Sequence, residues 1–211
     1  MPAEPPTARS APVAGILLAG GSSSRMGRNK LLFTLEGETL LRRAARAALG
    51  AGLEPVVVVL GHQAERTCRE LADLPCVVTV NPDHEAGIVT SLRAGLVALR
   101  DSTPAAVVML ADMPFVAAEM IAGLVERYRA TTAPLVISDY GGVNAPPMLY
   151  DRSLFAELAA MDDGRCGKQV IRRHRDEAEV LSWPEQALTD LDTPEDLAHV
   201  PGVLTARVEP T

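Results

Sequence analysis

The chain has 211 residues, of which 47% are hydrophobic, 22% are charged and only 3% are aromatic. This size and composition are ordinary for one globular α/β domain whose core is built from aliphatic side chains. A nucleic-acid-binding protein usually carries a basic face, so the formal net charge of −7 argues against that class.

The N-terminal segment, residues 1–11, is rich in Pro, Ala and Ser, and we expect it to be a disordered tail. It lacks the apolar core of a signal peptide, and the apolar run that follows is too short to span a bilayer, so no membrane association is expected. The three cysteines are odd in number and lack metal-ligand spacing, which favours free thiols and a cytoplasmic location. A single domain is expected over 12–200, followed by a C-terminal tail over 201–211.

Continuous apolar runs alternate with stretches of helical spacing along the chain. The runs predict strands buried on both faces, as in a mainly parallel sheet; they cover residues 13–19, 55–61, 105–112 and 134–138, with a weaker run at 76–80. Helices are predicted within residues 38–52, 63–74, 87–101 and 117–130. In the first helix the spacing predicts a buried face of Leu40, Ala44, Ala47 and Ala48. The alternation predicts the α/β class with right-handed crossovers.

The loop after the first run reads GGSSSRMGRNK and is the first candidate site, because ligands of open α/β sheets bind beyond the carboxyl ends of the strands. Gly20 and Gly21 permit a tight turn and close approach of the backbone to a ligand. Backbone N–H groups in such a loop bind anions, and Arg25 and Lys30 add positive charge suited to phosphates. The spacing is neither a P-loop nor a dinucleotide fingerprint. The alternative is a solvated loop with two surface cations.

Two aspartates follow later predicted strands. Asp112 ends the run VVMLAD, and its oxygens suit Mg²⁺; the alternative is a cap on the following helix. In the late segment LTDLDTPEDL, Thr193 and Pro194 suit a helix start, which leaves Asp192 without a local structural role. Asp192 is therefore a second magnesium candidate, with Asp190 as its near rival.

The segment LAGGSSSRMGRNKLL resembles the signature L-A-(A/G)-G-x-S-x-R-M-G-x-x-K of the MobA-like nucleotidyltransferases, closest to the molybdenum cofactor cytidylyltransferases (MocA-like). LADMP is similar to the family's magnesium-aspartate stretch. NPDHEAGIVTSLRAG resembles the family segment that passes near the base and ribose. The resemblance covers residues 13 to about 200 and implies a three-layer Rossmann-like nucleotidyltransferase fold with a mainly parallel central sheet.

The site residues are carried over from this resemblance, residue by residue. It implies nucleotide binding by Leu18, Ala19, Gly20, Gly21, Ser22, Arg25, Lys30, Gly87 and Ser91. It implies catalytic roles for Arg25, Lys30 and Asp112, and a magnesium ion on Asp112 and Asp192. Ser91 is open between a ligand contact and a plain hydroxyl on the helix surface. His84 is expected to have no role.

The activity implied is magnesium-dependent transfer of a nucleotide from an NTP to a phosphorylated acceptor, with release of pyrophosphate. CTP is favoured and GTP remains open, because Gly20-Gly21 resembles the guanylyl-transferring relatives whereas LADMPFV resembles the cytidylyl-transferring ones. The acceptor implied is molybdopterin carrying molybdenum, destined for a molybdenum hydroxylase apo-enzyme and expected to bind near residues 144–174. There Arg165 and Lys168 depart from the family pattern; they suit an anionic acceptor or are simply exposed charges. A sugar phosphate or other phosphorylated alcohol is the alternative acceptor, and a non-catalytic cofactor carrier is the alternative class.

Overall fold

The computed structural model describes residues 7–21, 29–161, 166–189 and 204–206. Within these ranges the centre is an eight-stranded sheet in the order β10-β7-β9-β6-β1-β4-β5, with β8 paired to β7. The strands are β1 Ala14–Ala19, β4 Val56–Leu60, β5 Cys76–Val80, β6 Ala105–Leu110, β7 Leu135–Tyr140, β8 Val143–Asn144, β9 Met148–Asp151 and β10 Glu179–Trp183. Strands β6, β1, β4 and β5 run parallel, as do β7 and β10, whereas β9 is antiparallel to both β6 and β7.

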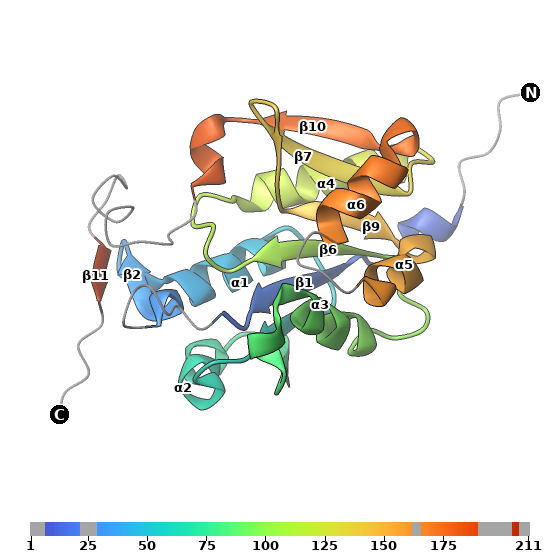
Figure 1. Ribbon diagram of the computed structural model, residues 1–211. Helices are drawn as coiled ribbons and strands as arrows, with labels where there is room; N and C mark the ends of the chain where they lie inside the picture. Colours follow the sequence, from blue (N-terminus) through green and yellow to red (C-terminus); the bar gives the residue numbers. More distant parts are fainter. Residues whose placement is uncertain (1–6, 22–28, 162–165, 190–203, 207–211) are drawn as a thin grey trace, which may run out of the picture.

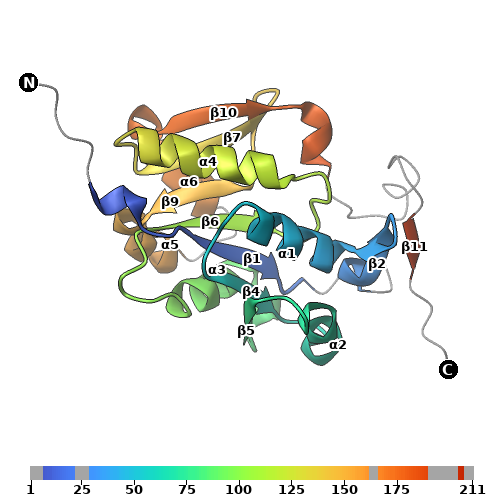
Figure 2. The same cartoon turned by 180° about the vertical axis from the view of Figure 1, so that it is seen from behind.

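Helices cover both faces of this sheet, which gives three layers (Figures 1 and 2). The α-helices are α1 Leu40–Gly50, α2 Ala64–Cys68, α3 Ile88–Val97, α4 Ala118–Ala130, α5 Phe155–Ala160 and α6 Cys166–Arg173. α3, α5 and α6 lie on the face turned to the viewer in Figure 1, and α1 and α4 lie on the face seen in Figure 2. Short 3-10 helices are η1 Thr7–Ser10, η2 Lys30–Leu32, η3 Arg69–Leu71, η4 His84–Ala86, η5 Arg152–Leu154, η6 Arg175–Glu177 and η7 Glu185–Leu188. Among the described helices, none has both the length and the apolar character that a membrane span requires.

The central strands are buried on both faces, which explains why their sequences are continuously apolar. In β1, Leu17 packs into the core beneath α1 and α4, while its neighbours Ile16 and Leu18 pack into the core beneath α3, α5 and α6. In β4, Val58 and Val59 divide in the same way, and every residue of that strand is buried. Because successive side chains point to opposite faces, both sets must be apolar when helices cover both faces.

The predicted strands and helices are present, with differences that have a tertiary cause. The buried face of α1 is Leu40, Leu41, Ala45 and Ala48 rather than the predicted set, because Ala44 and Ala47 lie at its margin and are only partly buried. The helix predicted over 63–74 is split into α2 and η3. The antiparallel strand β9, which lies between β6 and β7, was not predicted, because it is short and follows two prolines.

Two contacts involve segments predicted to be tails. Arg9 lies over the Tyr128 ring, 4.2 Å from its centroid, and donates a 2.7 Å hydrogen bond to the Tyr128 carbonyl near the C-terminal end of α4. β11 Leu204–Ala206 pairs antiparallel with β2 Phe33–Leu35, which also pairs with β3 Glu38–Thr39 in a second, three-stranded sheet. Parts of 1–11 and 201–211 therefore contact the domain.

Candidate active site

The strand order reverses beside β1, since β4 lies on one side of it and the later strand β6 on the other. Such a switch point opens a crevice beyond the carboxyl ends of the strands. A cavity of about 310 Å³ lies there. All the described residues of the predicted nucleotide site line it, and so does the predicted metal ligand: Leu18, Ala19, Gly20, Gly21, Lys30, Gly87, Ser91 and Asp112. Residues that are far apart in the sequence, from Leu18 to Asp112, thus meet at one cleft.

Lys30 and Asp112 face each other in this cleft. The Lys30 Nζ lies 2.6 Å from the Asp112 Oδ2, and the two side chains are 12% and 20% exposed. Asp112 is the second residue after β6, and the adjacent Ala111 amide donates a 3.1 Å hydrogen bond to the Leu18 carbonyl of β1. Helix α4 begins only at Ala118 with Ala117 as its N-cap residue, so Asp112 does not cap it. The cap alternative for Asp112 is therefore wrong.

Asn29 fixes the position of Lys30, and the sequence analysis did not single it out. Asn29 is 4% exposed, and its Oδ1 accepts a hydrogen bond of 3.1 Å from the Leu31 amide at the start of η2. Its Nδ2 donates to the His62 carbonyl at 3.4 Å, which joins this segment to the turn after β4. The residue type is a common N-cap, and this was the local signal that could have identified it.

Gly20 is packed so closely that a side chain would not fit without movement. A Cβ placed on Gly20 would lie 2.9 Å from the Ser91 Oγ, whereas a Cβ on Gly21 would meet no described atom within 4 Å. Ser91 is 4% exposed and accepts a 3.0 Å hydrogen bond from Asn81 Nδ2. The alternative that Ser91 is a plain surface hydroxyl is therefore wrong, because it lies on the inner, cleft-lining side of α3.

Asn81, which the prediction omitted, is the polar centre of the turn between β5 and α3. It is 3% exposed, and its Nδ2 also donates to Thr90 Oγ1 at 2.8 Å. Its Oδ1 accepts a 3.0 Å hydrogen bond from the Asp83 amide. These bonds hold Ser91 and the turn in one arrangement. The Asn-Pro pair directly after an apolar run was the available signal.

His84 also lines the cleft, although the sequence analysis gave it no role. Its ring lies edge-on to the His62 ring, with centroids 6.3 Å apart. A Cβ on Gly61 would lie 2.6 Å from the His84 Cβ. The glycine after β4 therefore leaves the space in which the His84 side chain lies beside the cleft. His84 and Gly61 thus shape the side of the cleft next to Gly20.

Ser22, Arg25, Arg165, Asp190 and Asp192 lie outside the described residues. Among the residues that are described, no group of three or more His, Cys, Asp or Glu side chains is arranged to hold a metal ion. Asp112 nevertheless fits a magnesium ion, because this ion is often held by one or two carboxylates together with the phosphates of a substrate.

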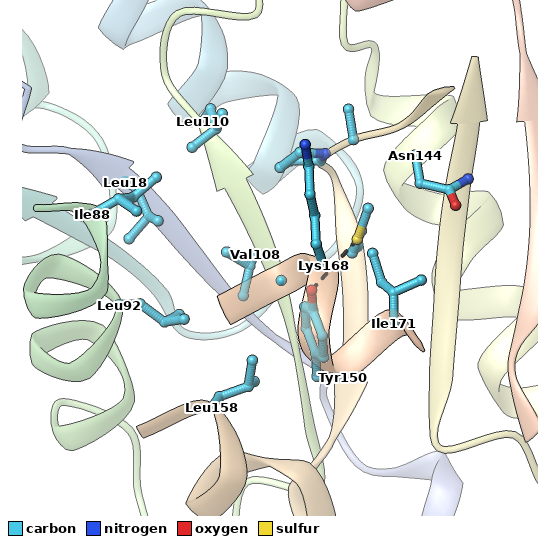
Figure 3. A pocket seen from close by; sticks show the side chains of 14 residues that line it. Leu18, Ile88, Leu92, Val108, Leu110, Asn144, Tyr150, Leu158, Lys168 and Ile171 are labelled. Carbon is cyan, nitrogen blue, oxygen red and sulfur yellow. Dashed lines mark hydrogen bonds between the residues drawn. The ribbon is translucent and has the colours of Figure 1, made fainter. Parts of the chain in front are cut away.

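A second cavity of about 300 Å³ adjoins the cleft and shares Leu18, Ile88 and Leu110 with it (Figure 3). It lies over β6 and β9 and is bounded by α3, α5 and α6. Most of its lining is apolar, including Leu92, Val108, Met148, Leu158 and Ile171. Lys168 also lines it, and its side chain extends toward the end of the cavity where Leu110 lies (Figure 3).

The outer wall of this second cavity is held by buried polar groups. Ser138 Oγ donates to the Pro147 carbonyl at 2.6 Å and accepts from Trp183 Nε1 at 2.9 Å. Tyr140 Oη donates to the Pro146 carbonyl at 3.0 Å, and burial raises the pKa of Tyr140 to about 12, so that the hydroxyl stays protonated. These bonds fix the segment before β9 against β7.

Helix α6 is fastened to α5 by an acidic side chain at the far end from Lys168. Glu157 accepts hydrogen bonds from Arg173 Nη1 at 2.6 Å and from the His174 Nε2 at 2.7 Å. Burial alone would raise the pKa of Glu157, but the hydrogen bonds from Arg173 and His174 bring it below its ordinary value. Glu157 thus anchors the helix that supplies one wall of the second cavity.

A doubly wound sheet with a lysine and an aspartate in contact at its switch point is an arrangement compatible with a nucleotide-binding enzyme. Residues 15–178 match the model of the MobA-like NTP transferase domain, and the chain belongs to this family. The predicted family, fold class and type of enzyme are thereby confirmed.

Two curated relatives illustrate the range of this family. The chain is 30% identical over 171 residues to a nicotine blue oxidoreductase of Paenarthrobacter nicotinovorans, covering 77% of this chain and 82% of that protein. It is 38% identical over 92 residues to a probable molybdenum cofactor guanylyltransferase of Opitutus terrae, covering 44% of this chain and 45% of that protein.

The fold also matches solved structures. The crystal structure of Rv0371c from Mycobacterium tuberculosis H37Rv superposes with a TM-score of 0.76 at 24% identity, covering 90% of this chain and 97% of that chain. A structure of Rv0371c in complex with manganese gives 0.75 at 23% identity, with the same coverage of both chains. At these identities the likeness concerns the fold.

Proposed function

We propose that the protein transfers a nucleoside monophosphate from an NTP, preferably CTP, to the phosphate of molybdopterin carrying molybdenum. The observation that carries this proposal is the 2.6 Å contact between Lys30 and Asp112 in a cleft that Gly20 and Ser91 also line. A cation and a carboxylate beyond the carboxyl ends of parallel strands, beside Gly20, which has no room for a side chain, suit a triphosphate and a divalent ion. Membership of the family supports the same reaction class.

The proposed reaction needs no protein nucleophile. An oxygen of the acceptor phosphate attacks the α-phosphorus of the NTP, the new P–O bond forms, and the bond to the β-phosphate breaks to release pyrophosphate. Lys30 offsets the negative charge that builds on the leaving pyrophosphate, and we assign the same task to Arg25. Gly87 and Ser91 lie beside the ribose and base in this proposal. Positioning and electrostatic stabilisation supply most of the rate in such chemistry.

We assign Asp112 to a magnesium ion, with Asp192 as a second ligand. When bound, a divalent ion neutralises phosphate charge and orients the phosphate oxygens. Asp112 suits this task because its carboxylate stands at the carboxyl end of β6 and is four-fifths buried, next to the cation that would bind the same phosphates. The 2.6 Å contact with the Lys30 Nζ holds the Asp112 carboxylate in place at the cleft.

The acceptor is assigned to the second cavity, which adjoins the nucleotide cleft at Leu18, Ile88 and Leu110. The dinucleotide product would then pass to a molybdenum hydroxylase apo-enzyme. We propose the cytoplasm as the compartment, in keeping with the free thiols of Cys68 and Cys76. The second candidate acceptor is a sugar phosphate, and the second candidate donor is GTP, favoured by the guanylyltransferase relative.

The test measures thermal stability with CTP, GTP, ATP and UTP, each with and without Mg²⁺. A nucleotide at about 100 times its dissociation constant adds roughly 2.7 kcal/mol to the free energy of unfolding. We expect the largest shift with CTP and Mg²⁺, and pyrophosphate release once molybdenum cofactor is added. Pyrophosphate release with a sugar phosphate but not with molybdenum cofactor would show that the acceptor is a sugar phosphate. No shift with any nucleotide would favour the non-catalytic carrier.

A further inference from the structure

The second cavity offers an acceptor very few polar partners. Asn144 lines it, but its amide is already bonded at both ends: Nδ2 donates to Asp139 Oδ1 at 3.1 Å, and Oδ1 accepts from Arg175 Nη1 at 2.8 Å. The Tyr150 hydroxyl donates to the Met148 Sδ at 3.4 Å. Apart from main-chain atoms, the described lining leaves a ligand a mostly apolar wall and the ammonium group of Lys168.

Lys168 is the charged residue of this lining, and no ion pair joins it to any residue in the described part of the chain. It is exposed on α6, and its side chain extends toward the Leu110 end of the cavity (Figure 3). Leu110 borders the nucleotide cleft as well, and Asp112 follows two residues later. An anion held by Lys168 would therefore lie at the boundary between the two cavities.

We propose that this pocket selects an acceptor with a flat apolar face and that Lys168 determines specificity by binding the acceptor's anionic group. The inference rests on the proposed function, because it names the class of molecule that the same reaction uses. It also chooses between the two acceptor candidates. A sugar would bury hydroxyls against Leu92, Val108 and Ile171 without partners, which is costly, whereas the face of a ring system is apolar and packs well there.

Binding of three probes, measured by isothermal titration calorimetry, tests the proposal without relying on turnover. 1-Naphthyl phosphate has a flat apolar body and a phosphate, 1-naphthol has the body alone, and ribose 5-phosphate has a phosphate on a polar body. We expect 1-naphthyl phosphate to bind at one site, roughly tenfold more tightly than either of the others. Tighter binding of ribose 5-phosphate would overturn the apolar part of the inference.

The role of Lys168 is tested with the variant Lys168→Met, which keeps the length of the side chain and removes its charge. Arg172→Met is the matched control, because Arg172 is exposed on the same helix and does not line the cavity. Lys168→Met should weaken the binding of 1-naphthyl phosphate roughly tenfold and leave the binding of 1-naphthol unchanged. Arg172→Met should change the affinity for neither probe. Equal losses in the two variants, or none in Lys168→Met, would refute the assignment.

The same titration is repeated with saturating CTP and Mg²⁺ to establish which cavity the probe occupies. Binding that persists supports the second cavity, and displacement by nucleotide would overturn the inference. Failure of the proposed function is seen separately, as the absence of nucleotide binding in the thermal-stability experiment. In turnover, Lys168→Met should raise KM for the acceptor with kcat and the KM for CTP unchanged.

Discussion

The nucleotide cleft and the apolar pocket share three residues, Leu18, Ile88 and Leu110, yet they are built in different ways. The cleft is lined by the ends of β1 and β6, by the turns that follow β1, β5 and β6, and by the starts of η2 and α3. Its wall combines glycines with polar side chains, among them Lys30, Ser91 and Asp112. The pocket is formed by side chains of α3, α5, α6, β6 and β9, and it is mostly apolar.

The difference has a chemical meaning. Every NTP carries the same triphosphate, and backbone amides with fixed charges bind it whichever base is attached. An acceptor must be distinguished by its own shape, and a pocket of apolar side chains around one cation does this by fitting the body and penalising buried polar groups. The cleft is thus suited to binding and reaction of the nucleotide, and the pocket to selection of the acceptor. Variants in the two regions should therefore change different measured properties.

The largest expected effect is in the cleft, at Asp112. Asp112→Asn should lower the rate of pyrophosphate release by about 10³-fold, because the amide removes the negative charge opposite Lys30 and is a poor magnesium ligand. The fold should be kept, as judged by circular dichroism. Asp176→Asn, at an exposed position in η6, is the control and should be fully active. Unchanged turnover in Asp112→Asn would show that Asp112 has no part in catalysis.

A second test compares the neighbouring glycines of the cleft. In Gly20→Ala the new methyl group would lie 2.9 Å from Ser91 Oγ, so the wall must shift and CTP should bind about tenfold more weakly. Gly21→Ala should bind CTP normally, because no described atom lies within 4 Å of the added group. The measurement is the dissociation constant for CTP. Equal weakening in both variants would show that close packing at Gly20 is not what shapes the cleft.

The asparagines of the two regions should differ in their effect on stability. Asn81→Ala leaves Ser91, Thr90 and the Asp83 amide without their buried partner and should lower the free energy of unfolding by about 2–3 kcal/mol. Asn144→Ala, at the half-buried rim of the pocket, should cost about 1 kcal/mol. Urea denaturation measures both. The reverse order would mean that the pocket, rather than the cleft, is the rigid region.

The smallest effect concerns the attachment of α6 beneath the pocket, and it depends on pH. The pKa of Glu157 is lower in the folded protein than its ordinary value. The ionised side chain therefore adds to the free energy of unfolding above about pH 4.3, and this contribution is lost as the pH falls through the folded-state pKa. Glu157→Gln should therefore cost up to about 1 kcal/mol of the free energy of unfolding at pH 7 and less at pH 3. Glu119→Gln, on the exposed side of α4, is the control. A cost that is the same at both pH values would contradict an ionic contribution from Glu157.

The sequence by itself determined the framework of this protein. The apolar runs at β1, β4, β5, β6 and β7 are local signals, and the rule that parallel strands place their carboxyl ends together was enough to predict one site from the turns that follow them. Lys30 and Asp112 were both singled out in this way, and the structure brings them into contact.

Which residues form the walls of the cleft and of the pocket was decided only by the tertiary structure. The parts that Asn81, His84 and Gly61 play in building the cleft became recognisable through their contacts with Ser91 and Gly20, which lie on other elements. The insertion of β9 between β6 and β7 and the pairing of β11 with β2 join segments distant in the chain. Lys168 stands in a polar stretch of sequence, and its place against an apolar pocket follows from how α6 packs. A turn next to a strand is fixed by its own residues, whereas a pocket is fixed by which distant side chains fill space together, and single-chain patterns carry little of that information.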